Sequence, residues 1–195
     1  MSKRILLLQG HPDDSTPHFG HALAEAYADG ARAAGHEVRT LALTGLDFPL
    51  LRRRADWESG PVPEGLKDAQ TQIAWCEHLV LLIPLWLGDM PALVKAFLEQ
   101  VARPGFAFSY GDGHGFPRKL LAGRSARVVV TMGMPAAVYR WLYRAHSVKA
   151  LERNILGFVG FAPVHESLIG MVEAKDDAGR KRWLARRGGL RRSAP

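Results

Sequence analysis

Several residues whose types and spacing could bind a ligand lie in short polar or glycine- and proline-rich segments of this chain. Three of these segments follow apolar runs typical of buried β-strands, and a tyrosine and a histidine come after the third. They are residues 10–15 (GHPDDS), 84–91 (PLWLGDMP) and 131–135 (TMGMP), then Tyr139 and His146. An open α/β sheet binds ligands at the carboxyl ends of its strands. The order of the segments therefore predicts one site assembled from several strand ends.

The first segment has the chemistry of an anion site. Gly10 and His11 end the first apolar run, and Ser15 and His18 precede a helix that begins near Phe19. Backbone N–H groups at a helix N-terminus bind anions, and hydroxyl and imidazole groups add donors. A flavin phosphate or a pyrophosphate fits this chemistry. On this loop alone, a hydroxyl N-cap with solvent-facing histidines fits equally well.

The second segment offers a surface for a flat ring. Pro84, Leu85, Trp86 and Leu87 leave the sheet with exposed backbone amides and one large aromatic side chain. An isoalloxazine ring needs an apolar wall and N–H donors along its polar edge, because the reduced ring carries negative charge there. Trp86 could instead belong to the core, which is a frequent place for tryptophan. The flavin interpretation depends on three loops converging.

Other kinds of site lack their sequence patterns. No G-x-G-x-x-G follows a strand, no G-x-x-x-x-G-K-[ST] is present, and the glycines of residues 111–115 have the wrong spacing. No G-x-S-x-G elbow presents a nucleophilic serine. His11, His18 and His21 have no carboxylate or cysteine at ligand spacing, so we expect no metal.

The spacing of apolar residues predicts five strands that alternate with helices. The strands are expected at Lys3–Gln9, Glu37–Leu43, His78–Pro84, Ala126–Thr131 and Ala162–Leu168. Helices are expected at 19–35, 64–77, 90–103, 138–156 and 175–187, with irregular passages at 44–65 and 105–123. Parallel strands need such crossover helices. The pattern predicts a flavodoxin-like α/β fold, a doubly wound five-stranded parallel sheet of order 2-1-3-4-5 with helices on both faces.

Length and composition favour one cytoplasmic domain. A chain of 195 residues that is 47% hydrophobic can bury one sizeable core, so residues 1–195 are expected to form a single domain. The only cysteine, Cys76, rules out an internal disulfide framework and favours a reducing compartment. The longest apolar run, Leu79–Leu87, is about half of the roughly 20 residues that a membrane helix needs. We expect no signal peptide and no membrane insertion.

The net charge of +7 is confined to the end of the chain. Seven basic residues lie between Arg180 and Arg192, and no acid follows Asp177. Without these seven, 19 of the 26 basic residues remain, which equals the number of acidic residues, 19. The excess therefore belongs to a last helix and a basic tail from about residue 186, for which a solvated end is the simplest interpretation. A neutral body without a recognisable module argues against nucleic-acid binding.

Together these pieces resemble the NAD(P)H:quinone oxidoreductase family. The matching segments are 10–13 (GHPD), 22–27 (ALAEAY), 34–38 (AGHEV), 84–86 with 88–93 (PLW, GDMPAL) and 104–108 (PGFAF). The likeness extends from Arg4 to about Trp183. It implies a flavodoxin-like fold, bound FAD or sometimes FMN, NAD(P)H as co-substrate, and a homodimer with its sites at the interface.

The resemblance also assigns residues to the flavin. It places His11, His18, Phe19 and Gly20 in the phosphate-binding turn, with Ser15 nearby. It lines the flavin edge with Pro84, Leu85, Trp86 and Leu87, and closes the other side with Thr131, Met132, Gly133 and Met134. The chain departs from the family in a longer first loop, in Leu87 where an aromatic is usual, and in Met134-Pro135 in place of a glycine.

Two residues beyond the third segment match the family's catalytic pair. Tyr139 matches a tyrosine that, with a downstream histidine, stabilises the charge on the flavin during hydride transfer. His146 is the candidate for that histidine, although its spacing is longer and a surface position fits it equally well. The implied reaction is a two-electron, ping-pong reduction of quinones or related electrophilic acceptors. The alternative is a flavin-binding cytoplasmic regulatory subunit of a potassium efflux system, which would turn over poorly alone.

Overall fold

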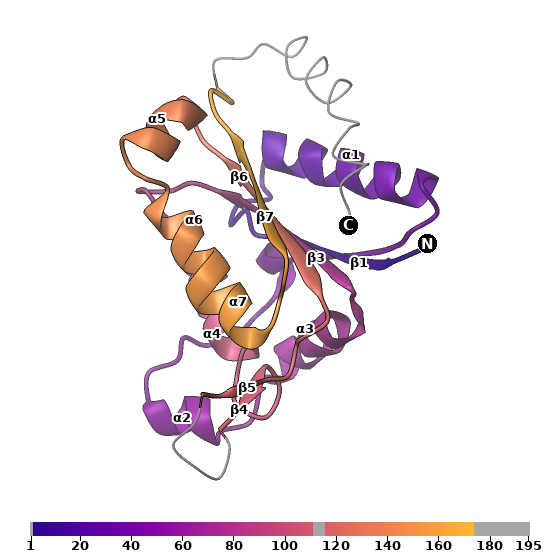
Figure 1. Cartoon of the computed structure of the whole chain (residues 1–195), viewed down its shortest axis with the longest axis vertical. Helices are drawn as coiled ribbons and strands as arrows, with labels where there is room; N and C mark the ends of the chain where they lie inside the picture. Colours follow the sequence, from indigo (N-terminus) through magenta and orange to yellow (C-terminus); the bar gives the residue numbers. More distant parts are fainter. Residues whose placement is uncertain (1, 111–115, 174–195) are drawn as a thin grey trace.

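The structure, a computed structural model, describes residues 2–110 and 116–173 (Figure 1). Five parallel strands form its main sheet in the order β2-β1-β3-β6-β7. They are β1 (Arg4–Gln9), β2 (Glu37–Ala42), β3 (His78–Pro84), β6 (Ser125–Thr131) and β7 (Val164–Ile169). In sequence order this is the predicted 2-1-3-4-5 arrangement, so the flavodoxin-like fold is confirmed.

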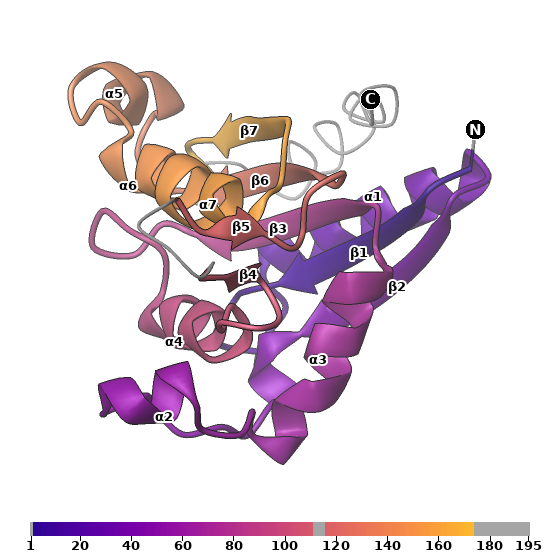
Figure 2. The same cartoon turned by 60° about the horizontal axis from the view of Figure 1, so that its bottom comes forward.

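Helices cover both faces of the sheet, and alternate strand residues pack against them. On one face, Ile5 and Leu7 of β1 pack with Leu23 and Ala28 of α1 (Phe19–Ala33). The other face carries α3 (Glu64–Trp75), α4 (Ala92–Val101), α6 (His146–Ala150) and α7 (Gly157–Val159) (Figures 1 and 2). The central strands β3 and β6 are buried along their whole lengths, which is why β3 is a nearly continuous apolar run and β6 has three successive valines.

The strand register brings the ligand-binding segments to one edge. Gln9 pairs with Ala42 and with Leu82, and Thr131 pairs with Pro84 and with Ile169. The carboxyl ends of β1, β3, β6 and β7 therefore lie beside one another. Their following loops meet at the same edge of the sheet, as the sequence predicted.

The prediction of a single helix over 138–156 is wrong, because the structure divides this range into several elements. The structure has α5 (Ala136–Trp141), a turn, and then α6, which continues through a π-helical segment η2 (Leu151–Leu156) into α7. Arg144 and Ala145 adopt left-handed backbone conformations, with φ of 54° and 48°. Such residues cannot continue a right-handed helix. The Ala145 N–H instead donates to the Tyr139 carbonyl at 3.1 Å, which closes the turn.

Two passages predicted to be irregular contain short elements. Residues 44–65 overlap η1 (Leu43–Gly45) and include α2 (Arg54–Glu58), and the next passage holds the antiparallel pair β4 (Phe108–Ser109) and β5 (Arg118–Lys119). The predicted helix 175–187 and the basic tail lie outside the described residues. Within the described ranges, no helix has the length and apolar character needed to cross a membrane. The single-domain assignment stays a prediction.

Candidate functional site

A pocket of about 260 Å³ opens at the carboxyl ends of β1, β3 and β6. Most of the residues assigned to the flavin line it: His11, His18, Phe19, Gly20, Pro84, Leu85, Trp86, Thr131, Met132 and Gly133. The pocket also has three lining residues that the sequence analysis missed, namely Pro17, Val172 and Glu173. Three loops that are distant in the sequence thus converge, as the prediction required.

The missed residues Val172 and Glu173 belong to a fourth loop, which follows β7. The N–H of Val172 donates to the Met132 carbonyl at 3.2 Å, and the Met171 N–H donates to the Met134 carbonyl at 3.2 Å. These bonds attach the loop to the segment after β6. The strand-end rule that identified the other loops applies equally here, but the segment 170–173 has no histidine or aromatic residue to draw attention to it.

The Gln9 side chain stabilises the first loop from the end of β1. Its side chain is buried at the end of β1, 6% exposed, and forms two hydrogen bonds. The Nε2 amide donates to the Gly20 carbonyl at 3.0 Å, and the Oε1 oxygen accepts from the His11 N–H at 3.1 Å. Gln9 therefore connects the start of the loop with the first turn of α1. The sequence analysis did not select it because it lies inside the apolar run.

Two histidine rings line the pocket, and a third, that of His21, lies beside them. His11 and His18 are stacked with centroids 3.9 Å apart, and His21 meets both rings edge-on. His18 is joined through Nε2 to the Asp13 carboxylate at 2.7 Å. Burial, and then the neighbouring His18, lower the pKa of His11, which favours its neutral form. The stacked pair thus lines the pocket with two imidazole rings.

Asp13 adds a fixed negative charge beside these rings. The Ser15 hydroxyl and the Ser15 N–H donate to its Oδ1 oxygen at 2.6 Å and 2.9 Å. Hydrogen bonds from the Ser15 side chain and then from His18 hold the pKa of Asp13 well below its usual range. Ser15 is therefore engaged by Asp13 and does not line the pocket.

The N-terminus of α1 opens onto the same space. His18 is the N-cap residue in an extended conformation, with no side-chain capping bond and no acidic residue in the first turn. The hydroxyl N-cap considered for this loop, from Ser15 or Thr16, is therefore wrong. A 15-residue helix has a positive N-terminal end, and here the N–H groups of His21 and Ala22 point back to the His18 carbonyl at 3.0 Å and 3.4 Å. A positive helix end fits a phosphate, which is the charged part of a flavin nucleotide.

Trp86 stands at the wall of the pocket and is not a core residue. Its side chain is 48% exposed and meets the His11 ring edge-on, with centroids 5.9 Å apart. Two backbone bonds between Trp86 and Asp89, of 2.9 Å and 3.0 Å, close a tight turn around Leu87 and Gly88. Leu87 is consequently fully exposed, with a φ of 49°, and points out of the pocket lining. A half-exposed indole fits the flat apolar wall that an isoalloxazine ring requires.

Tyr139 and His146 do not reach this pocket. Tyr139 is 2% exposed, and its hydroxyl shares a 2.6 Å hydrogen bond with the Ser147 hydroxyl. His146 begins α6 and is exposed. The left-handed turn at Arg144 and Ala145 separates the two residues onto different helices. Met134 likewise packs against the core and is not part of the lining.

Metal ligands do not gather at this site. Among residues 2–110 and 116–173, no three His, Cys, Asp or Glu side chains are grouped so that they could hold a metal ion. The histidines of the first loop stack on one another, and their closest carboxylate is engaged by Ser15. The chemistry of the pocket is that of a helix N-terminus, two imidazole rings, an indole face and the Glu173 carboxylate.

Comparison with curated proteins finds relatives that align with most of the chain. An uncharacterized NAD(P)H oxidoreductase of Haemophilus influenzae is 26% identical over 183 residues, which cover 92% of this chain and 89% of that protein. An FMN-dependent NADH:quinone oxidoreductase of Macrococcus caseolyticus is 27% identical over 188 residues, covering 85% and 86% of the two chains. The resemblance stated from the sequence segments is confirmed by these relatives.

Solved structures share the fold at low sequence identity. The NAD(P)H:quinone oxidoreductase of Methanothermobacter marburgensis superposes with a TM-score of 0.78 at 22% identity, covering 100% of both chains. An FMN-dependent NADH-azoreductase of Bacillus anthracis in complex with FMN has a TM-score of 0.71 at 14% identity, covering 96% of both chains. A family model described as Flavodoxin-like fold matches residues 3–187. The chain therefore belongs to this flavodoxin-like family.

Proposed function

We propose that the chain is an FMN-dependent NAD(P)H oxidoreductase that reduces quinones or related electrophilic acceptors. The observation that carries the proposal is the 260 Å³ pocket, where the N-terminus of α1, two stacked histidines and Trp86 converge. The relatives support it, because their names include NAD(P)H oxidoreductase and FMN-dependent NADH:quinone oxidoreductase. Those names favour FMN, whereas the resemblance had placed FAD first.

Different residues of the pocket would bind different parts of such a cofactor. The first turn of α1 and the edges of His11 and His18 would bind the phosphate, and Trp86 would cover the ring. Gly133 lies beside Glu173 in the lining, where a Cβ atom would make an ordinary contact of 3.4 Å with the Glu173 carboxylate oxygen. A bound flavin would accept hydride from a nicotinamide nucleotide and deliver it to the acceptor. The protein contributes binding and orientation.

The catalytic roles of Tyr139 and His146 rest on the family resemblance. The Tyr139 hydroxyl shares a hydrogen bond with Ser147, so donation to a flavin would require this bond to open. His146 lies on an exposed helix start. In a single chain, the backbone N–H groups and the imidazoles of the pocket are better placed to contact a cofactor.

A homodimer is the assembly that we propose. Trp141, Leu142 and Tyr143 expose 78%, 74% and 54% of their surfaces next to one another at the end of α5, and Leu87 is fully exposed. Large exposed apolar side chains in one segment are typical of protein interfaces. Sedimentation analysis tests this assembly, with Trp141→Ser as the disrupting variant. A cytoplasmic location, consistent with the free buried Cys76, stays a prediction.

Steady-state kinetics test the reaction. With FMN bound, NADH or NADPH and a quinone should give turnover, and plots at several acceptor concentrations should be parallel, as a ping-pong mechanism requires. Intersecting plots would reject the ping-pong order and leave the reductase standing. Flavin binding with negligible turnover would reject the enzyme and favour the regulatory subunit, which draws no support from the relatives described above.

A further inference from the structure

The pocket at the strand ends has no permanent cation in the part of the chain that the structure describes. Among the described residues that line it, none is a lysine or an arginine, and the one carboxylate is that of Glu173. A phosphate monoester carries a charge of about −1.5 to −2 at pH 7. The side chains of the lining that could balance this charge are the imidazoles of His11 and His18. The inference drawn from them rests on the proposed function, which places the flavin phosphate here.

Asp13 is bonded to both imidazole rings. Its backbone carbonyl lies 2.9 Å from His11 Nδ1, and its carboxylate oxygen Oδ2 lies 2.7 Å from His18 Nε2. The Asp13 N–H lies farther from His11 Nδ1, at 3.2 Å, so the carbonyl decides the tautomer of that ring. Carbonyl and carboxylate oxygens only accept hydrogen bonds. Each ring therefore donates to Asp13 from the nitrogen that contacts it.

This arrangement leaves the second nitrogen of each neutral ring without a hydrogen. A neutral imidazole has one N–H group, and Asp13 uses that group in both rings. His11 Nε2 and His18 Nδ1 are consequently acceptors, and neither has a hydrogen-bond partner among the described residues. The oxygens of a phosphate dianion are also acceptors. A phosphate can therefore bond to these nitrogens only after one of them has been protonated.

The stacked rings favour a single additional proton. The ring centroids of His11 and His18 are 3.9 Å apart, so two imidazolium rings would repel each other. Burial, and then His18, lower the pKa of His11, which favours its neutral form, whereas a dianion beside the ring would raise this pKa. The other titratable groups around the pair are His21, which meets both rings edge-on, the Asp13 carboxylate, and Glu173 on the loop after β7.

We propose that Asp13 is a positioning residue that couples phosphate binding to the uptake of a proton by the pair His11 and His18. Asp13 holds both neutral rings as acceptors, and the pair is protonated when the phosphate enters. The proton comes from the solvent, and one imidazole nitrogen becomes a charged N–H donor to a phosphate oxygen. Because binding takes up a proton, the affinity for FMN should fall as the pH rises above 7.

Isothermal titration of FMN in buffers of different ionisation enthalpy tests the proposal. The observed binding enthalpy varies linearly with the ionisation enthalpy of the buffer, and the slope is the number of protons taken up. We expect about 0.5 to 1 proton per FMN at pH 7.5, and a dissociation constant that rises by up to about tenfold between pH 7 and 8. Riboflavin, which has the same ring but no phosphate, should give a slope near zero.

Two neighbouring aspartates provide a matched pair of variants. In Asp13→Asn, the amide oxygen can still accept from Ser15, and the amide N–H can donate to His18 Nε2. The neutral His18 ring then has its hydrogen on Nδ1, where it can donate to the phosphate without a further proton. Proton uptake and the pH dependence of the dissociation constant should therefore both decrease. Asp14 is exposed, so Asp14→Asn removes the same charge and should keep the uptake of the unmodified protein.

The possible results separate this inference from the proposed function. FMN that binds with a slope of zero, or a slope for riboflavin equal to that for FMN, would overturn the proton uptake and leave the flavin site standing. Uptake that is unchanged in Asp13→Asn, or equally reduced in Asp13→Asn and Asp14→Asn, would overturn the positioning role. So would an affinity loss in Asp13→Asn by the same factor at every pH, which is the effect of a purely structural residue. A protein that binds no FMN would overturn the proposed function and this inference with it.

Discussion

At the scale of single residues, the proposed flavin pocket depends on side chains that no motif marks. Gln9 is part of an apolar strand in the sequence, yet its amide bridges His11 and Gly20, both of which line the pocket. His11, His18 and Trp86 could be selected from the sequence because their types suit a nucleotide. Gln9 could not, because its importance lies in two hydrogen bonds that exist only after the chain has folded.

Gln9→Leu should weaken FMN binding. Leucine fills a similar volume but leaves the His11 N–H and the Gly20 carbonyl without their partners, so the first turn of α1 is no longer held to β1. We expect the dissociation constant for FMN, measured by fluorescence quenching, to rise about tenfold. Gln70→Leu is the control, because Gln70 also donates to a backbone carbonyl, that of Val101, far from the pocket lining. Equal losses in both variants would show that Gln9 acts only through overall stability.

Trp86→Ala and Tyr139→Phe should affect different quantities. Trp86→Ala removes the exposed indole wall, so less FMN should remain bound after gel filtration. Tyr139→Phe leaves the lining intact, so the amount of bound FMN should be unchanged. If the Tyr139 hydroxyl donates a hydrogen bond to the flavin, its removal should slow flavin reduction in stopped-flow measurements. An unchanged reduction rate would remove Tyr139 from the catalytic assignment. Full retention of FMN by Trp86→Ala would remove Trp86 from the binding site.

At the scale of elements, strands were easier to predict than helix ends. The predicted and observed limits of β3 coincide, and the other strands differ only near their ends, because buried parallel strands are compact apolar runs. The break between α5 and α6 could not be predicted, because the left-handed residues there are Arg144 and Ala145, and neither type signals such a conformation. The interruption also explains why Tyr139 and His146 do not share one helix face.

Arg144→Gly should stabilise the protein. Arg144 is exposed with a φ of 54°, and a left-handed conformation costs a non-glycine residue about 1 kcal/mol. Glycine removes that cost, so the free energy of unfolding in urea should rise by up to about 1 kcal/mol, reduced by the greater freedom of glycine in the unfolded chain. Lys149→Gly, at an exposed right-handed position in α6, should instead lower it by about 1 kcal/mol. A decrease in both variants would contradict the strained turn.

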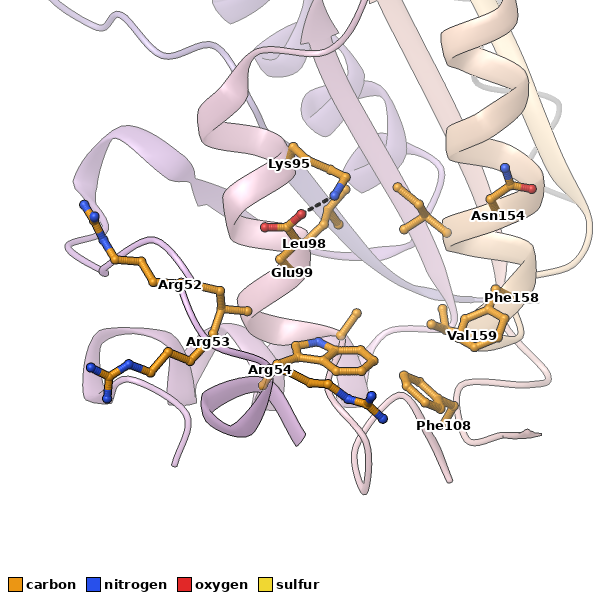
Figure 3. Close-up of a pocket in the computed structure, with 14 residues that line it drawn as sticks. Arg52, Arg53, Arg54, Lys95, Leu98, Glu99, Phe108, Asn154, Phe158 and Val159 are labelled. Carbon is orange, nitrogen blue, oxygen red and sulfur yellow. Dashed lines mark hydrogen bonds and ion pairs between the residues drawn. The ribbon is translucent and has the colours of Figure 1, made fainter. Parts of the chain in front are cut away.

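At the scale of the whole molecule, the two ends of the parallel strands differ in what they carry. The carboxyl ends of the strands carry the proposed flavin pocket, whereas the opposite ends bury His78, which bonds to the Ser125 hydroxyl at 2.8 Å. The family match over residues 3–187 and the confirmed strand order account for this polarity. A second pocket, of about 500 Å³ and lined among others by Phe108 and Phe158 (Figure 3), could not be predicted from the sequence, because the segments that carry these residues meet only in the folded chain.

Burial of His78 should make stability depend on pH. Burial, and then the nearby Arg127, lower the pKa of His78 from 6.5 to about 4. Below pH 6.5 the His78 imidazole is protonated in the unfolded chain, whereas in the folded chain it stays neutral down to about pH 4. The free energy of unfolding should therefore fall by a few kcal/mol between pH 6.5 and 4. Urea titrations of His78→Asn should show a smaller fall, whereas His165→Asn, at an exposed position, should behave like the unmodified protein. Parallel pH profiles for all three proteins would contradict this.

An anaerobic absorption titration tests the central claim most directly. The purified protein is saturated with FMN, freed of excess cofactor by gel filtration, and titrated with NADH and separately with NADPH in the absence of oxygen. The account predicts a retained flavin band that bleaches with one equivalent of a nicotinamide nucleotide and returns when a quinone is added. A protein that retains no FMN, or a bound FMN that neither nucleotide bleaches, would contradict it.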